Sequence, residues 1–234
     1  MRVQGLCLVV LSVLCACAWT TSAFAQIDYE SGQDTVFAHS QTSPLWISGQ
    51  GNAIFQWHPR FPAQYSGPNS FEHASEQAAS VILTLYTGLQ LTHTSEALLD
   101  VESAGGSGLS RVLGLGAFTN VDATRNPSLD ESPYIARAEL HQVIPLPGST
   151  LQVERTPISL LTTVPARRID FYLGKFSVVD FFDNNAVAGD SHTQFMNWCV
   201  VDTCSYDYAA DTRGYSWGLV AGFVDNWWSF RFGE

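Results

Sequence analysis

Alternation of apolar and polar residues is the feature that most constrains how this chain can fold. In residues 81–92 one set of alternate positions is almost wholly apolar and the other is mostly polar. Successive side chains of a β-strand point to opposite faces of a sheet. This pattern therefore predicts a strand with an apolar face (Val81, Leu83, Leu85, Leu89 and Leu91) and a polar face (Thr84, Tyr86, Gly88, Gln90 and Thr92).

The same period of two returns in six further segments, so the sequence predicts an all-β fold of about seven antiparallel strands. These segments are residues 45–57, 96–102, 134–141, 168–173, 214–223 and 228–232. Tyr134 and Ala136 are placed on the apolar face of their segment, and Tyr215 on that of 214–223. Ten residues are expected to share one outward face: Val81, Leu83, Leu85, Leu99, Ala138, Leu140, Ile169, Phe171, Leu219 and Phe223.

Two architectures produce such strands. A soluble β-sandwich buries the apolar faces between two sheets, whereas an outer-membrane barrel turns them to lipid and keeps the polar faces around a lumen. Mid-strand charges favour the barrel, as do the aromatic residues at segment ends, where interfacial girdles lie: Trp46, Trp57, Tyr134, Tyr172, Trp227 and Trp228. A secreted β-sandwich that binds glycans remains the alternative.

Connection lengths also alternate, as in outer-membrane barrels with short periplasmic turns and long outer loops. Short reversals are expected at residues 92–95 and 225–226, and long loops at 58–79, 104–132 and 178–212. Residues 145–166 break this scheme and are interpreted as an irregular, proline-containing excursion. An odd number of strands does not close an antiparallel barrel, so we expect the chain to be the N-terminal part of a larger one.

The first 25 residues have the pattern of a secretory signal peptide. Arg2 precedes an apolar run, and Ala23-Phe24-Ala25 fits a cleavage site after Ala25. Residues 26–44 would then form a periplasmic N-terminal segment, and residues 45–234 the barrel part. Export to an oxidising compartment predicts a disulfide between Cys199 and Cys204, with two free thiols as the alternative.

The charge excludes some functions. A formal net charge of −11, with a single lysine, argues against nucleic acid as a partner, because phosphate binding needs a basic surface. The motifs of serine hydrolases and zinc proteases are absent from the sequence, and no metal-ligand spacing is present. We therefore expect no enzyme activity, no catalytic residues, no cofactor and no metal site.

Several ordered stretches resemble one family. They are ISGQGNAIFQWHPRFPAQYSGPNSF (47–71), LTLYTGLQLT (83–92), DVESAGGSGLSRVLGLGAFTNVDATRNPSL (100–129), FYLGKFSVVDFFDNN (171–185), DSHTQFMNW (190–198) and DYAADTRGYSWG (207–218). Together they resemble the carbohydrate-selective porins of the OprB type. The resemblance implies a sixteen-stranded outer-membrane barrel that passes sugars by diffusion. It also implies outer-membrane lipid as a partner and leaves a homo-oligomer open.

Charged residues on the polar faces are the candidate lumen residues: Asp100, Glu102, Arg137, Glu139, Arg168, Asp170 and Arg231. Guanidinium groups donate and carboxylates accept, so a mixed-charge surface can exchange hydrogen bonds with sugar hydroxyls. Structural ion pairs between neighbouring strands are the alternative role for each residue. A helix over residues 109–118, after Gly105, Gly106 and Gly108, is expected to fold inward and narrow the channel.

Overall fold

The computed structural model describes residues 39–67, 70–112, 130–182 and 209–234. The long strands are β1 (Leu45–His58), β2 (Glu76–Thr92), β3 (Ser95–Gly106), β4 (Tyr134–Pro145), β7 (Arg168–Phe176), β8 (Ser216–Val224) and β9 (Ser229–Gly233). The short elements are the 3-10 helices η1 (Leu109–Val112) and η2 (Val178–Asp180) and the strands β5 (Thr150–Gln152) and β6 (Thr163–Pro165).

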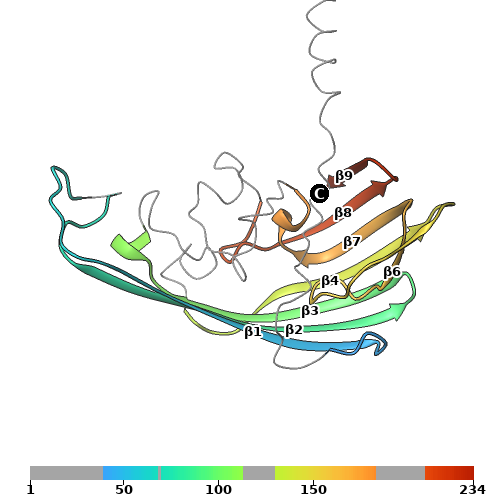
Figure 1. The fold of residues 1–234 in the computed structure, drawn as a ribbon, viewed down its shortest axis with the longest axis horizontal. Helices are drawn as coiled ribbons and strands as arrows, with labels where there is room; N and C mark the ends of the chain where they lie inside the picture. The colour runs from blue at the N-terminus through green and yellow to red at the C-terminus, as the bar shows by residue number, and fades with distance from the viewer. Residues whose placement is uncertain (1–38, 68–69, 113–129, 183–208) are drawn as a thin grey trace, which may run out of the picture. The chain divides into compact units, whose positions relative to one another are not determined.

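Seven strands form one antiparallel sheet in the order β1-β2-β3-β4-β7-β8-β9 (Figure 1). Every neighbour in the sheet is also the next long strand along the chain, so the sheet is a simple meander. The predicted all-β fold with about seven antiparallel strands is therefore confirmed. The sheet is strongly curved, and η2 lies on its concave side (Figure 1).

Two predicted short reversals join strands at the same end of the sheet, which we call the turn end. β2 passes into β3 through residues 93–94, and β8 passes into β9 through residues 225–228. In the second turn the backbone N–H of Asp225 donates to the carbonyl of Trp228 at 2.9 Å. The excursion 145–166 also leaves from the turn end, and it contains the two-stranded β5–β6 hairpin.

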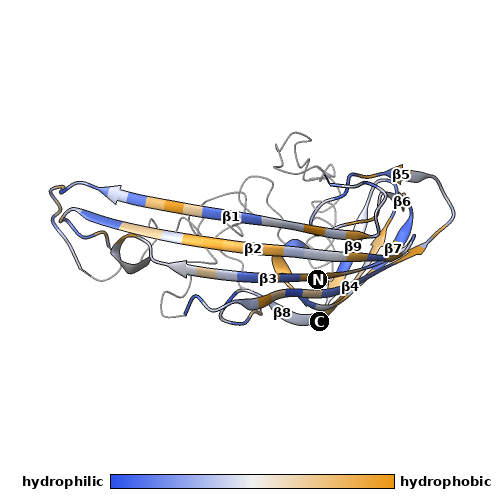
Figure 2. Ribbon diagram, turned by 90° about the horizontal axis from the view of Figure 1, so that it is seen from below, coloured by the Kyte–Doolittle hydropathy of each residue, from blue (hydrophilic) through white to orange (hydrophobic). Residues whose placement is uncertain are grey.

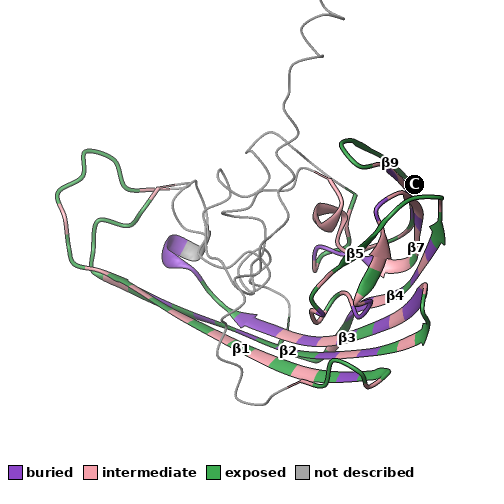
Figure 3. Ribbon diagram, turned by 45° about the vertical axis from the view of Figure 1, so that its right-hand side comes forward, coloured by how far each residue is buried: buried purple, intermediate pink, exposed green. Residues whose placement is uncertain are grey.

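A water-soluble protein buries apolar side chains and exposes charged ones, whereas this sheet exposes many apolar side chains and buries charged ones. Along β2 and β3 buried residues alternate with exposed or partly exposed ones (Figure 3). The large exposed side chains of these two strands are mostly apolar, although Ile82 and Leu98 are buried on the other face. Polar and apolar bands follow one another along the same strands (Figure 2). Six residues of the expected outward set are exposed: Val81, Leu83, Leu85, Leu99, Leu140 and Leu219. The other four, Ala138, Ile169, Phe171 and Phe223, are partly exposed.

The prediction was wrong for Tyr134. A β-bulge shifts the register of β3 and β4 so that Asp100 faces Arg137 but Val101 faces Ile135. The extra residue in β4 turns Tyr134 to the same face as Arg137 and leaves Ile135 exposed on the other face. The bulge depends on how β3 and β4 pair, so the alternation of residues in the sequence did not reveal it.

Trp46 and Tyr172 do not lie in the expected girdle, although alternation places Tyr172 on the polar face, and Tyr215 is not on an exposed apolar face. Trp46 is buried with Leu98 on the concave face, and Tyr172 stacks on His141 there. Tyr215 precedes β8 and is buried. By contrast, Trp57, Trp227 and Trp228 are exposed, as residues of a membrane-facing girdle would be.

Some predicted features fall outside the described residues. The signal peptide, its cleavage site, and Cys199 and Cys204 all lie there. The helix predicted over residues 109–118 is described only as far as η1, which ends at Val112. Within the described part of the chain, no helix is long and apolar enough to cross a membrane.

Candidate functional site

The concave face of the sheet holds the charged side chains that the alternation placed on the polar faces of the strands. They form two groups. The Arg137 cluster consists of Asp100, Arg137, Glu139 and Asp180, and the His141 cluster of Glu96, His141, Arg168 and Asp170. Strands β3, β4 and β7 supply all of these residues except Asp180, which ends η2.

One guanidinium faces three carboxylates in the Arg137 cluster. Arg137 Nε donates to Asp100 Oδ2 at 3.0 Å, Nη1 to Glu139 Oε2 at 3.2 Å, and Nη2 to Asp180 Oδ2 at 2.7 Å. The side chain of Arg137 is 8% exposed and that of Asp180 is 26% exposed. The cluster is thus negative overall, and it reaches solvent mainly through Asp180.

Backbone register explains most of this geometry. Asp100 lies directly opposite Arg137 across β3 and β4, where side chains on the same face are in contact. Glu139 is two residues further along β4, which returns it to the same face. Asp180 comes from a distant part of the sequence, and η2 brings it over the sheet (Figure 1).

Neighbouring hydroxyl groups donate hydrogen bonds to the carboxylate of Glu102. Thr84 Oγ1 donates to Glu102 Oε2 at 2.9 Å, and the Tyr134 hydroxyl donates to Oε1. Thr84 lies opposite Glu102 in the register of β2 and β3, and the bulge in β4 brings Tyr134 within reach. The Glu102 side chain is buried and held in one orientation, so it is less available to a passing solute than Asp180 is.

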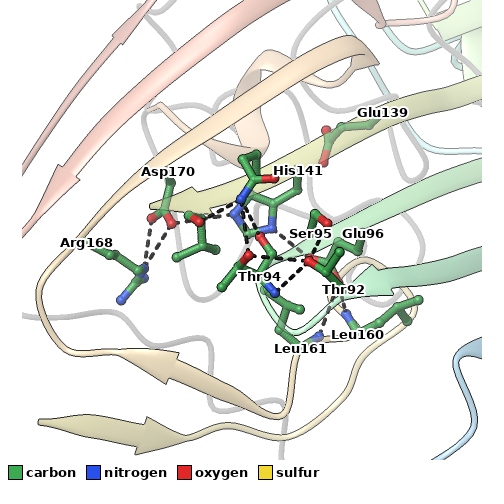
Figure 4. A network of polar contacts seen from close by, with 12 residues as sticks. Thr92, Thr94, Ser95, Glu96, Glu139, His141, Leu160, Leu161, Arg168 and Asp170 are labelled. Atoms are coloured by element: carbon green, nitrogen blue, oxygen red, sulfur yellow. Dashed lines mark hydrogen bonds and ion pairs between the residues drawn. The ribbon is translucent and has the colours of Figure 1, made fainter. Parts of the chain in front are cut away.

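The His141 cluster lies near the turn end (Figure 4). His141 Nδ1 is 2.8 Å from Glu96 Oε1, and its Nε2 is 3.5 Å from Asp170 Oδ1. Arg168 Nε lies 3.0 Å from both oxygens of Asp170. The Tyr172 ring stacks on the imidazole with centroids 4.1 Å apart. This arrangement fixes the imidazole between two carboxylates and one aromatic ring.

A second set of charges lies at the opposite end of the sheet, where residues 209–215 approach β7. Lys175 Nζ is 2.9 Å from Asp211 Oδ2. Burial opposes ionisation of Asp211, but hydrogen bonds from Lys175 and from the backbone N–H groups of Tyr215 and Arg213 outweigh it and lower the pKa of the carboxyl. The guanidinium of Arg213 lies 4.5 Å from the centroid of the Tyr134 ring, which fastens this segment to β4.

All seven candidate lumen residues thus lie on the concave face, and five of them belong to the two clusters. Arg231 lies opposite Gly222, which lies opposite Asp170, so its side chain is on the same face as Asp170. It is exposed, and none of the described contacts of either cluster involves it. Three cluster members were not among the candidates: Glu96, His141 and Asp180. Alternation already placed Glu96 and His141 on polar faces, but no sequence pattern connects Asp180 to Arg137.

The arrangement offers hydrogen-bond donors and acceptors along a curved surface. In the described residues no group of three or more histidine, cysteine, aspartate or glutamate side chains could hold a metal ion. Comparison with protein-family models, curated proteins and solved structures found no match.

Proposed function

We propose that this sheet forms the wall of an outer-membrane channel through which sugars and other small neutral solutes diffuse. The observation that carries the proposal is the inverted burial of the sheet. On one face leucine, valine, phenylalanine and tryptophan side chains are exposed, while on the other face carboxylates and a guanidinium are buried. Transmembrane barrels have this distribution, because lipid surrounds the apolar face and water fills the lumen.

The free energy of removing apolar side chains from water favours lipid at the apolar face. Covering a large aliphatic or aromatic side chain stabilises a protein by roughly 1.5–3 kcal/mol. The exposed set extends over all seven strands of the sheet, from Ile47 in β1 to Phe232 in β9. Contiguous apolar surface of this kind is uncommon on soluble monomers and marks a face that contacts a membrane or a partner. The resemblance to OprB-type porins points to the membrane.

The glycan-binding β-sandwich is less well supported. A sandwich needs the apolar face to pack on a second sheet. The second sheet of the described residues is the three-residue pair β5–β6, which is too short to cover β1 to β9.

Charge on the concave face suits neutral solutes. The Arg137 cluster joins three carboxylates to one guanidinium, and Glu102 adds a carboxylate whose described partners are hydroxyl groups. A negative surface repels anions, while fixed donors and acceptors still bind hydroxyl groups. We therefore expect a neutral sugar to pass faster than an anionic sugar acid of equal size.

Solute flux into liposomes tests this function. Liposomes reconstituted with the full-length barrel that contains this sheet are compared with protein-free liposomes for uptake of glucose and of gluconate, two solutes of similar size. The expected result is uptake of glucose well above the protein-free rate, with gluconate slower than glucose. Uptake no faster than in protein-free liposomes would contradict the proposal.

A further inference from the structure

The excursion between β4 and β7 folds back over the concave face. Leu160 packs against Trp46 of β1 and Leu98 of β3, and it is fully buried. A Cβ atom placed on Gly88 of β2 would lie 2.8 Å from Leu160 Cδ1, so the glycine leaves room for this side chain. Residues around Leu160 therefore lie across three neighbouring strands, on the side that carries the charged clusters.

Glu96 anchors the same segment through its backbone. The carboxylate Oε2 of Glu96 accepts hydrogen bonds from the N–H groups of Leu160, at 2.5 Å, and Leu161, at 3.1 Å (Figure 4). The other oxygen, Oε1, faces His141. Hydrogen bonds to a charged acceptor are about twice as strong as neutral ones, and Glu96 is almost completely buried.

Arg155 fixes the opposite side of the segment. Its Nη1 donates to the carbonyl oxygens of Ser40 at 2.8 Å and Ser43 at 2.7 Å, and its guanidinium lies over the Trp46 ring. Between Arg155 and Leu160 the chain reverses tightly, with paired backbone hydrogen bonds joining Thr156 and Ser159. Residues 153–162 are thus held at both ends and in the middle, unlike a loop that extends into solvent.

We propose that residues 153–162 are a built-in constriction that sets the largest solute able to pass the turn end of the channel. This inference rests on the proposed function, because only a channel has a size limit. A fixed segment across β1 to β3 removes space from the concave side, and exposed Ile158 and Glu154 belong to the surface that remains. Glu96 and Leu160 are positioning residues that hold the segment in place.

Two variants release the segment in different ways. Glu96→Ala removes the acceptor of the two N–H bonds, and Leu160→Ser removes the apolar contact but keeps Glu96 and His141. Asp130→Ala and Leu151→Ser are the matched controls, since they delete a carboxylate and an aliphatic side chain from exposed positions outside residues 153–162. Circular dichroism of each reconstituted variant checks that the strands are intact.

Trypsin cleavage after Arg155 reports whether the segment is seated, because this side chain is 4% exposed in the intact fold. Glucose and raffinose uptake by liposomes reports the size limit. In both variants we expect cleavage about tenfold faster than in the wild type and a raffinose-to-glucose ratio raised several-fold, with the controls unchanged.

Unchanged cleavage in both variants would overturn the inference, because these contacts would then not hold the segment. Faster cleavage with an unchanged uptake ratio would also overturn it and leave the channel function standing. Absence of glucose uptake by the wild type would instead overturn the proposed function, and the constriction with it.

Discussion

Leu83 and Thr84 are adjacent in β2, yet the leucine is 55% exposed and the threonine is 4% exposed. Thr84 points to the concave face and donates to Glu102, whereas Leu83 points away from the sheet. A soluble protein arranges such a pair the other way round. Exposed apolar residues next to buried polar ones recur in the sheet. Substitution of an exposed leucine by a charged residue therefore tests what surrounds the apolar face.

Leu83→Arg separates a lipid-facing position from a water-facing one. In a bilayer an arginine near the middle of a barrel strand costs about 2–4 kcal/mol of stability, whereas an exposed leucine in water tolerates the change. We expect a loss of that size in the free energy of unfolding from phospholipid vesicles, measured by tryptophan fluorescence in urea. Leu151→Arg, in the short hairpin outside the main sheet, is the control and should stay within about 0.5 kcal/mol of wild type.

Arg137→Ala is expected to destabilise the fold by about 3–5 kcal/mol, because it leaves the buried carboxylates of Asp100 and Glu139 without their cation. The same urea titration measures this loss. Arg60→Ala, at an exposed position after β1, is the matched control. A loss below about 1 kcal/mol in Arg137→Ala would mean that the two carboxylates find other partners or are neutral.

Arg168→Ala is expected to change ion selectivity more than stability. The Arg168 side chain is partly exposed and balances Asp170, so its removal leaves His141 as the ion-pair partner of Asp170 among the described residues. A more negative lumen favours cations, and reversal potentials across a KCl gradient should shift toward the potassium potential. Arg167→Ala removes the adjacent arginine, which pairs with Asp225 at the turn end, and should leave the reversal potential unchanged.

Asp211 gives the expected pH dependence of stability. Its pKa is lowered in the folded chain, so the ionised group stabilises the fold at pH values above the pKa of an unfolded aspartate, about 3.9. This contribution is lost as the pH falls through the lowered folded value. Asp211→Asn should therefore melt at a lower temperature than wild type near about pH 7, and the two should converge near about pH 2. Asp130→Asn, an exposed control, should show little difference at either pH.

The strands of the fold could be predicted from alternation, because a period of two and a face preference survive in almost every long strand. Thr84, Asp100 and Asp170 all lie on the faces expected from their neighbours. Tyr134 does not, since the bulge at β4 depends on how two strands pair rather than on the residues of either one. Local patterns carry no information about such a register shift.

The site could be predicted only in part. Candidates within strands, such as Asp100 and Arg137, meet because antiparallel pairing makes them neighbours. Asp180 and Leu160 reach the concave face through tertiary folding of η2 and of the excursion, and no spacing rule connects them to Arg137 or Glu96. The excursion was expected to be irregular, but its position over the concave face follows from its buried leucines and the Glu96 carboxylate.

Lipid exposure of neighbouring residues tests the central proposal most directly. Single spin labels at Leu83, Leu140 and Leu219, and at Thr84, Glu139 and Val220, are measured in vesicles for collision with oxygen, which partitions into lipid, and with a water-soluble nickel chelate. The proposal predicts that the leucine positions collide with oxygen and the alternate positions do not. Equal access of nickel to Leu83, Leu140 and Leu219, with oxygen collisions no higher than at Thr84, would contradict it.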